Sequence, residues 1–277
     1  MTPAIAPTQN WSALLDLELT AGEVKTHLHP KKRYGPLSVQ RPFYPEQDYC
    51  HVYLLHPPGG VVGGDQLDLN IASREQSHAL FTTPGATKFY LSAGETALVK
   101  QQLDLQHGSS LEFLPQENIY FPGARVYTHT QIDVVPGSVA MLWEKHCFGR
   151  PANEEVFTHG QVTSELSLRS AGRLIFNEKQ RIDEHEINRA SGLRGNPVYG
   201  SFLIYAEDLD DSLLDQLRQI QTEQGYCGIT RTRKELLIVR YMGNSTAQLN
   251  HYFIQLWDQI RTVVLKRNSC HPRIWNT

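Results

Sequence analysis

The sequence predicts a mainly β fold in which many short strands form a stacked, β-helix-like arrangement, with two helices in the C-terminal third. Apolar and polar residues alternate with period two through most of the first two thirds of the chain. Turn sequences such as "HPPGG", "TPGA", "FPGA" and "VPGS" recur at intervals too short for the connecting helices of a doubly wound α/β fold. Residues 103–113 and 132–142 share one strand–turn–strand pattern, and such copies gain stability by stacking on one another.

Individual strands are predicted where the alternation is clearest. Apolar residues on one parity mark a strand with one buried face. The two copies of the repeat each supply a pair of strands, and a looser third copy with a longer turn precedes them. The predicted strands lie in residues 15–19, 67–82, 103–113, 132–142, 162–168 and 235–243.

Two helices are predicted from apolar residues spaced three and four apart, in residues 208–223 and 248–266. The first has acidic residues in its first turn, and Gly225 lies just beyond its end. Ser245 and Thr246 are candidate caps for the second helix.

The second predicted helix carries an aromatic stripe formed by Tyr252, Phe253 and Trp257. A stripe of this width either packs in a core or meets another protein. We therefore take these three residues as partner-binding candidates, with core packing as the alternative.

Composition predicts one globular domain spanning residues 1–277. Hydrophobic residues make up 40% of the chain and the net charge is −3, so a packed core is expected and nucleic acid is not an expected partner. No apolar run is long enough for a membrane span, and no leader pattern is present at the start, so we expect a cytoplasmic protein. The four cysteines form no Cys-x-x-Cys pair and are expected to be reduced thiols.

The stretch "HPPGGVVGGDQLDL" contains Gly59, Gly60, Gly63 and Gly64, followed by Asp65. Its spacing fits neither a dinucleotide fingerprint nor a P-loop. The alternation after Asp65 predicts that the loop opens a strand and not a helix.

Three carboxylates stand beside glycine or proline turns: Asp65, Glu117 and Glu144. Glu117 and Glu144 each follow the second strand of a repeat copy, so stacking is expected to bring them to the same side. Aligned carboxylates serve glycoside hydrolysis or hold a hydrated divalent ion, and the alternative is that they are surface charges. Lys88, between a small-residue turn and aromatic residues, would need a carboxylate partner if buried.

Two short segments are weak candidates for metal ligands. His27 and His29 lie two residues apart and are expected on one strand face. Cys270 and His271 are adjacent near the end of the chain, where a flexible tail could bring both to one ion.

Four segments together resemble the UreD (UreH) family of urease accessory proteins: "YPEQDYCHVYLLHPPGGVVGGDQLDL", "TTPGATKFY", "LEFLPQENIYFPGAR" and "WEKHCFGRPANEEVF". The similarity runs from about residue 14 to about residue 239. It implies a non-enzymatic chaperone for nickel insertion, with no tightly bound cofactor and transient Ni²⁺ at most. It also implies a complex with UreF, with the GTPase UreG through UreF, and with apo-urease.

We infer from the resemblance that Asp65, Glu117 and Glu144 line a nickel path, with the four glycines leaving room for a hydrated ion. Ni²⁺ moves through a protein only if the contacts are successive and weak, and oxygen ligands meet that need better than thiolates. Two other functions stay open from sequence. The chain could be a carbohydrate-active hydrolase with paired carboxylates, or a scaffold that the ion never enters.

Overall fold

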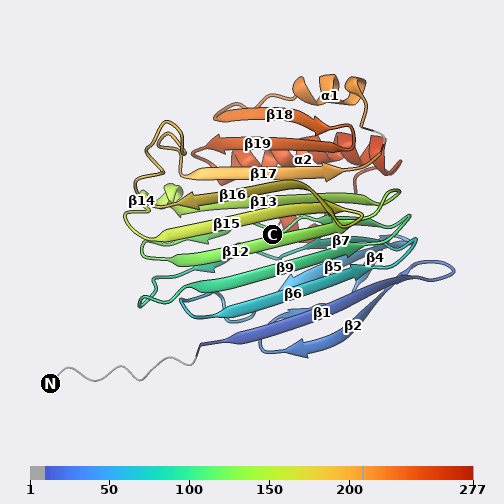
Figure 1. Cartoon of the computed structure of the whole chain (residues 1–277), viewed down its shortest axis with the longest axis horizontal. Coiled ribbons are helices and arrows are strands. Elements are labelled where there is room, and N and C mark those ends of the chain that lie inside the picture. Colours follow the sequence, from blue (N-terminus) through green and yellow to red (C-terminus); the bar gives the residue numbers. More distant parts are fainter. Residues whose placement is uncertain (1–9, 208, 277) are drawn as a thin grey trace.

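Two β-sheets face each other across a buried apolar interior in the computed structural model, which describes residues 10–207 and 209–276 (Figure 1). The smaller sheet has seven strands in the order β16-β15-β12-β9-β6-β1-β2. These are β1 (Ser12–Ala21), β2 (Thr26–Tyr34), β6 (Gln66–Ser73), β9 (Ala97–Leu105), β12 (Arg125–Val134), β15 (Gln161–Ser170) and β16 (Arg173–Ile182).

The larger sheet has the main order β18-β19-β17-β13-β10-β7-β5-β3, with four short strands beside it. The main strands are β3 (Ser38–Val39), β5 (Tyr49–Leu55), β7 (His78–Thr82), β10 (Ser110–Phe113), β13 (Val139–Arg150), β17 (Val198–Tyr205), β18 (Tyr226–Arg233) and β19 (Leu236–Gly243). The short strands are β4 (Phe43–Glu46), β8 (Thr87–Phe89), β11 (Asn118–Tyr120) and β14 (Glu155–Val156).

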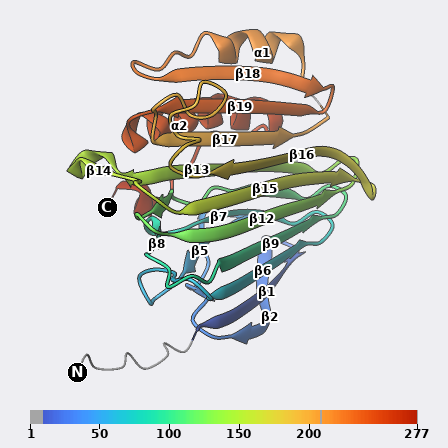
Figure 2. The same ribbon diagram turned by 60° about the vertical axis from the view of Figure 1, so that its left-hand side comes forward.

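The central part of the chain is a coil that alternates between the two sheets. In the smaller sheet β1, β6, β9, β12 and β15 pair in parallel, and in the larger sheet β5, β7, β10 and β13 do the same. Antiparallel pairs close both ends, with β2 against β1 at one end and β17, β19 and β18 at the other (Figure 2). The predicted stack of strands is therefore confirmed.

The repeat seen in the sequence is the unit of this coil. Leu103 lies level with Ile132 in the parallel ladder, and the neighbouring aspartates of the two copies are also level. Ile71 lies level with Leu103 and Ile132 with Leu168, so one buried apolar row crosses the smaller sheet. The third copy, which the sequence starts at Leu67, is offset in the ladder, because Ile71 and not Leu67 is level with Leu103.

Two α-helices occur in the C-terminal third, as predicted. Helix α1 (Asp211–Arg218) is shorter than expected because the chain tightens at Gln219 and turns back toward β18; the predicted start at Asp208 lies outside the described residues. Helix α2 (Thr246–Val264) has Ser245 as its N-cap, whose side chain accepts a hydrogen bond from the Gln248 amide. Two single-turn helices, η1 (Pro151–Asn153) and η2 (Arg273–Asn276), complete the structure.

Helix α2 covers the outer face of the larger sheet, against β13, β17 and β19. Tyr252, Phe253 and Trp257 are at most 1% exposed, because their stripe faces this sheet. The expectation that they bind a partner is corrected: they are core residues. Within the described part of the chain, neither helix has the length and hydropathy of a bilayer-spanning segment.

Candidate functional site

A band of polar side chains crosses the interior between the two sheets. On one side of it lies the apolar cluster that contains Leu17 and Phe113, and on the other lies a cluster that contains Phe89 and Val126. Alternation along each strand turns these polar residues inward, where an apolar side chain is the usual occupant. We call this set the polar belt; it consists of Gln101, Thr128, Thr130, Glu144, Ser164, Glu178 and Ser201.

Glu144 lies at the centre of the polar belt. One carboxylate oxygen accepts a hydrogen bond from the Thr130 hydroxyl at 2.6 Å, and the other accepts from the Ser164 hydroxyl at 3.3 Å. His146 places its Nε2 3.8 Å from the same carboxylate, and its Nδ1 is 2.9 Å from the Tyr120 hydroxyl. A carboxylate has about four acceptor positions, so Glu144 keeps capacity for a cation.

Glu178 forms the second acidic point of the polar belt, but its acceptor positions are filled. Tyr199 and Gln180 donate to one oxygen at 3.0 Å each. Arg240 donates to the other oxygen at 2.6 Å, and the Ser201 hydroxyl lies at 3.4 Å. Burial, followed by the charge of Glu178, raises the pKa of Tyr199, so this phenol stays a hydrogen-bond donor.

Three hollows lie in series along the polar belt. A cavity of about 110 Å³ between the sheets and a constriction of about 20 Å³ share Glu144 in their walls. The constriction shares Gln180 and Tyr199 with a surface groove of about 460 Å³. Thr128 lines the larger cavity, and its buried hydroxyl has no hydrogen-bond partner among the described residues. It is therefore available to a polar guest.

Asp65 does not lie in the polar belt. It is 2% exposed, and its two carboxylate oxygens accept hydrogen bonds from the backbone amides of Trp11 at 2.8 Å and Val62 at 2.9 Å. His56 lines the larger cavity, and burial lowers the pKa of its imidazole. The negative charge of Asp65 opposes this lowering. Asp65 thus holds the glycine-rich loop on β1 and β6 next to the cavity.

Three of the four glycines of this loop leave no room for a hydrated ion, which corrects the expectation for those three. A Cβ atom on Gly60 would lie 2.2 Å from the Tyr90 ring, and one on Gly63 would lie 2.1 Å from the Ser92 hydroxyl. Gly64 would meet the side chains of residues 10 and 95, whereas Gly59 faces open space. The loop is rich in glycine because it packs closely on the following turn of the coil.

Glu117 and Glu144 do not share a side of the stack. Phe113 is level with Leu142, but Asn118, five residues later, is level with His146, which is only four residues later, so β10 and β11 are separated by one extra residue. The charge of Glu117 acts on Lys145 and Cys147, on the face of β13 that looks toward α2. Glu144 points the opposite way, into the interior. The expected alignment is wrong because the extra residue between β10 and β11 puts Glu117 beside Lys145, on the opposite parity from Glu144.

Lys88 is exposed, and no carboxylate partner for it is found among the described residues. Its backbone carbonyl accepts a hydrogen bond from the Val61 amide at 2.7 Å, so its structural part is to hold the glycine-rich loop. Among the described residues, the buried lysine is Lys145, whose Nζ donates to the Asn250 side chain at 2.6 Å.

Of the two weak candidates for metal ligands, the structure keeps one pair together and separates the other. His27 and His29 do share a face of the edge strand β2, with ring centroids 6.3 Å apart, and His29 also contacts Thr20. His271 turns to Asp258, at 2.8 Å, and so does not join Cys270. Cys270 instead meets two residues that sequence reasoning did not select, Glu46 and His51.

The polar belt was missed by sequence analysis apart from Glu144. Gln101 in "ALVKQQLDL" and Thr130 in "RVYTHTQIDV" occupy inward positions of otherwise apolar alternation, and this break in parity was the available signal. Glu178 gave no comparable signal, because β16 has no clear apolar parity.

Comparison with known sequences identifies the family. The profile of the "UreD urease accessory protein" family matches residues 12–276. Urease accessory protein UreD of Alcanivorax borkumensis is 43% identical over 97% of this chain and 93% of its own length. The proteins of that name from Aliivibrio fischeri and Pseudomonas putida are 39% and 40% identical, and each alignment covers at least 95% of both chains. The chain therefore belongs to the UreD family of urease accessory proteins.

Proposed function

We propose that this protein acts as a nickel-insertion chaperone for urease and offers Ni²⁺ a passage through its polar belt. Membership of a family of urease accessory proteins supports a role in urease maturation, and such proteins are not themselves enzymes. The hydrolase alternative needs a pair of carboxylates that face each other. Glu117 and Glu144 do not form such a pair, because they lie on opposite faces of one strand layer. The observation that carries the passage is the series of neighbouring hollows, two of which share Glu144 in their walls.

The lining of the hollows suits an ion that must bind and leave. The larger cavity and the constriction offer carboxylate, hydroxyl and amide oxygens, and no cysteine of the described chain lines either of them. Oxygen ligands hold Ni²⁺ less tightly than thiolates do, so release stays fast. A space of about 20 Å³ holds about one water molecule, so the ion exchanges part of its water for protein oxygens at Glu144.

The charges of the polar belt also support a passage for a divalent ion. Arg240 neutralises Glu178 at a separation of 2.6 Å, whereas Glu144 has only hydroxyl donors and a histidine around it. Glu144 is therefore the carboxylate with a free negative charge at the narrowest point. A divalent ion is attracted there, and the hydroxyl oxygens of Thr130 and Ser164 are weak ligands that let it move on.

Substitution of Glu144 tests the passage. We expect Glu144→Gln to slow urease activation about 10-fold, the effect of losing about 1.4 kcal/mol of stabilisation at the constriction. Thr128→Val, which removes the unpartnered hydroxyl of the cavity, should slow it less. The measurement is urease activity and nickel content per urease in cells that express the complete urease operon.

The matched control is Glu165→Gln. Glu165 follows Ser164 on β15 and points to the outer face, where it contacts Tyr127 and Lys179. The Glu165→Gln variant should therefore leave the rate of urease activation unchanged. If the Glu144→Gln variant is present in the complex at the wild-type level and urease is still activated normally, the passage is contradicted. The protein would then act only as an adaptor.

The partners that we propose are UreF, the GTPase UreG held through UreF, and the subunits of apo-urease. The sequence resemblance supports this assembly, and co-purification of the chain with each partner tests it. The four cysteines are free thiols in the structure, which suits a reducing compartment, and we place the complex in the cytoplasm.

A further inference from the structure

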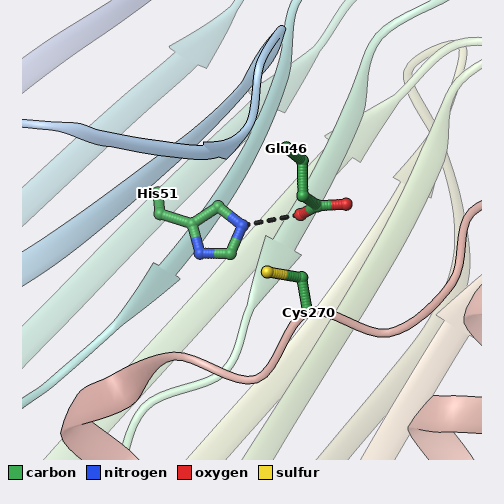
Figure 3. A group of neighbouring side chains, drawn as sticks. All are labelled: Glu46, His51 and Cys270. Atoms are coloured by element: carbon green, nitrogen blue, oxygen red, sulfur yellow. Dashed lines mark hydrogen bonds and ion pairs between the residues drawn. The ribbon is translucent and has the colours of Figure 1, made fainter.

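A second polar cluster lies on the opposite face of the larger sheet from the polar belt. Figure 3 shows Glu46, His51 and Cys270 pointing toward one another from the β4–β5 hairpin and from the segment that follows α2. One ligand atom from each residue lies within 4.8 Å of the other two. Cys50 and Val52 face the apolar interior, so His51 between them faces outward, beneath the C-terminal segment.

We propose that Glu46, His51 and Cys270 form a binding site for one borderline divalent transition-metal ion, of the Zn²⁺ and Ni²⁺ class. A carboxylate oxygen, an imidazole nitrogen and a thiolate together match the ligand preferences of these ions. Hard ions such as Mg²⁺ and Ca²⁺ take oxygen ligands and have no use for the thiolate.

The geometry allows the three ligands to close on an ion. Bond lengths of about 2.0–2.3 Å put tetrahedral ligands about 3.3–3.8 Å apart, so side-chain rotations that shorten the longest separation by about 1 Å suffice. One carboxylate oxygen of Glu46 lies 2.7 Å from His51 Nε2 and accepts a hydrogen bond from Arg261 at 2.8 Å. Neither its other oxygen nor the Cys270 sulfur has a hydrogen bond to another described residue.

Metal binding requires a change at His51. The imidazole binds as a neutral base, so its Nε2 gives up the hydrogen bond to Glu46 and its proton is carried on Nδ1. Arg261 keeps its bond to the Glu46 carboxylate and orients it, as partners of metal ligands commonly do. Cys270 is only partly buried, which leaves a side open for a water ligand.

The charge balance of the cluster favours an ion. Among the permanently charged groups of the cluster, the positive charge of Arg261 is outweighed by Glu46 and by Glu112, whose carboxylate lies 3.1 Å from the guanidinium. The buried set then carries one net negative charge. A divalent ion that displaces the thiol proton adds one positive charge overall and makes the set neutral, which removes an uncompensated buried charge.

The site would fasten the end of the chain to the body of the protein. The segment after α2 is otherwise held by polar contacts, among them Arg267 to Asp48 at 3.0 Å and the Trp275 indole to Thr82 at 2.9 Å. An ion bound to Cys270 and to the β4–β5 hairpin closes the same loop with stronger bonds, so residues 265–276 become better ordered when the metal is present.

The test is a titration of the full-length chain with Co²⁺, a spectroscopic substitute for Zn²⁺. We expect a near-ultraviolet charge-transfer band from a thiolate–cobalt bond, displaced by Zn²⁺ and by Ni²⁺. Cys270→Ser should abolish the band and weaken metal binding at least about 10-fold. Because Cys270 lies in the terminal segment and is partly exposed, this variant is expected to fold, whereas a variant of the buried His51 risks misfolding.

Two variants serve as matched controls, Cys227→Ser at an exposed thiol elsewhere and His271→Ala at the neighbour that turns to Asp258. Both should keep the band. Hydrogen exchange supplies a second readout, because Zn²⁺ should slow exchange in residues 265–276 of the wild type and not of Cys270→Ser. A band that persists in Cys270→Ser, or no band and no protection at all, overturns the site. Glu144→Gln should keep the band, so this result is independent of the nickel passage.

Discussion

Asp65 was proposed from sequence as a residue of the nickel path, but in the structure its carboxylate oxygens already accept two backbone hydrogen bonds. We therefore assign it a structural role. Removing its side chain leaves the amides of Trp11 and Val62 without an acceptor. We expect Asp65→Ala to lower the free energy of unfolding by about 1–3 kcal/mol, because two partly buried donors lose their acceptor. Urea denaturation of the variant measures it.

Asp68→Ala is the matched control for this change. Asp68 lies three residues along on β6 and is only partly buried, so its loss should alter the free energy of unfolding by less than about 0.5 kcal/mol. Equal stability of the Asp65 and Asp68 variants would show that the loop does not depend on these two hydrogen bonds.

Lys145 gives the protein a pH dependence at the scale of one residue. Burial lowers its pKa to about 7, against a smaller opposing effect of the Glu117 charge, whereas in the unfolded chain lysine keeps a pKa of about 10.4. Between these values the unfolded chain binds a proton that the folded chain does not, so stability rises as the pH increases from about 7 to about 10.

We expect Lys145→Met to remove this rise. The variant should be more stable than the wild type near neutral pH, by about 1–3 kcal/mol, and the difference should shrink toward pH 10 or so. Denaturation curves of both proteins across this range measure it. The same dependence of stability on pH in the wild type and in the variant would contradict a buried lysine of low pKa.

At the scale of elements, the glycine-rich loop is a packing device. We expect Gly63→Ala to lower the free energy of unfolding by about 1–3 kcal/mol, because its Cβ would lie 2.1 Å from the Ser92 hydroxyl and 2.5 Å from the Glu95 carbonyl. Thermal unfolding measures the effect. Gly228→Ala on the exposed strand β18 is the control, since no atom lies within 4 Å of its added Cβ. Similar loss of stability in both variants would argue against close packing of the loop.

The strands were predictable where one face is buried and the other solvated, as in β1, whose leucines alternate with half-buried acidic residues. Helix α2 was predictable to within two residues at each end, since its apolar spacing and its Ser245 cap agree. Helix α1 was predicted too long, because Ile220 continues the apolar spacing although the chain has already turned toward β18.

At the scale of the whole molecule, the sequence predicted a stack but not its interior. The repeat fixed which strands are neighbours, and the match of Leu103 with Ile132 bears this out. The polar belt depends on register across several strands at once, and a shift of one residue reverses a side chain from inside to outside. That is why Glu144 and Glu117 seemed equivalent in sequence and lie on opposite faces in the fold.

The antiparallel strands at both ends of the coil constrain how such a chain can change its length. Within the two sheets, each circuit of the coil pairs with the circuits before and after it. Extra residues are therefore accommodated at the corners or as a complete added circuit. An insertion within a strand would displace Thr130 from Glu144 and break the line of oxygens, so tolerance to indels should be lowest where the chain crosses the middle of the sheets.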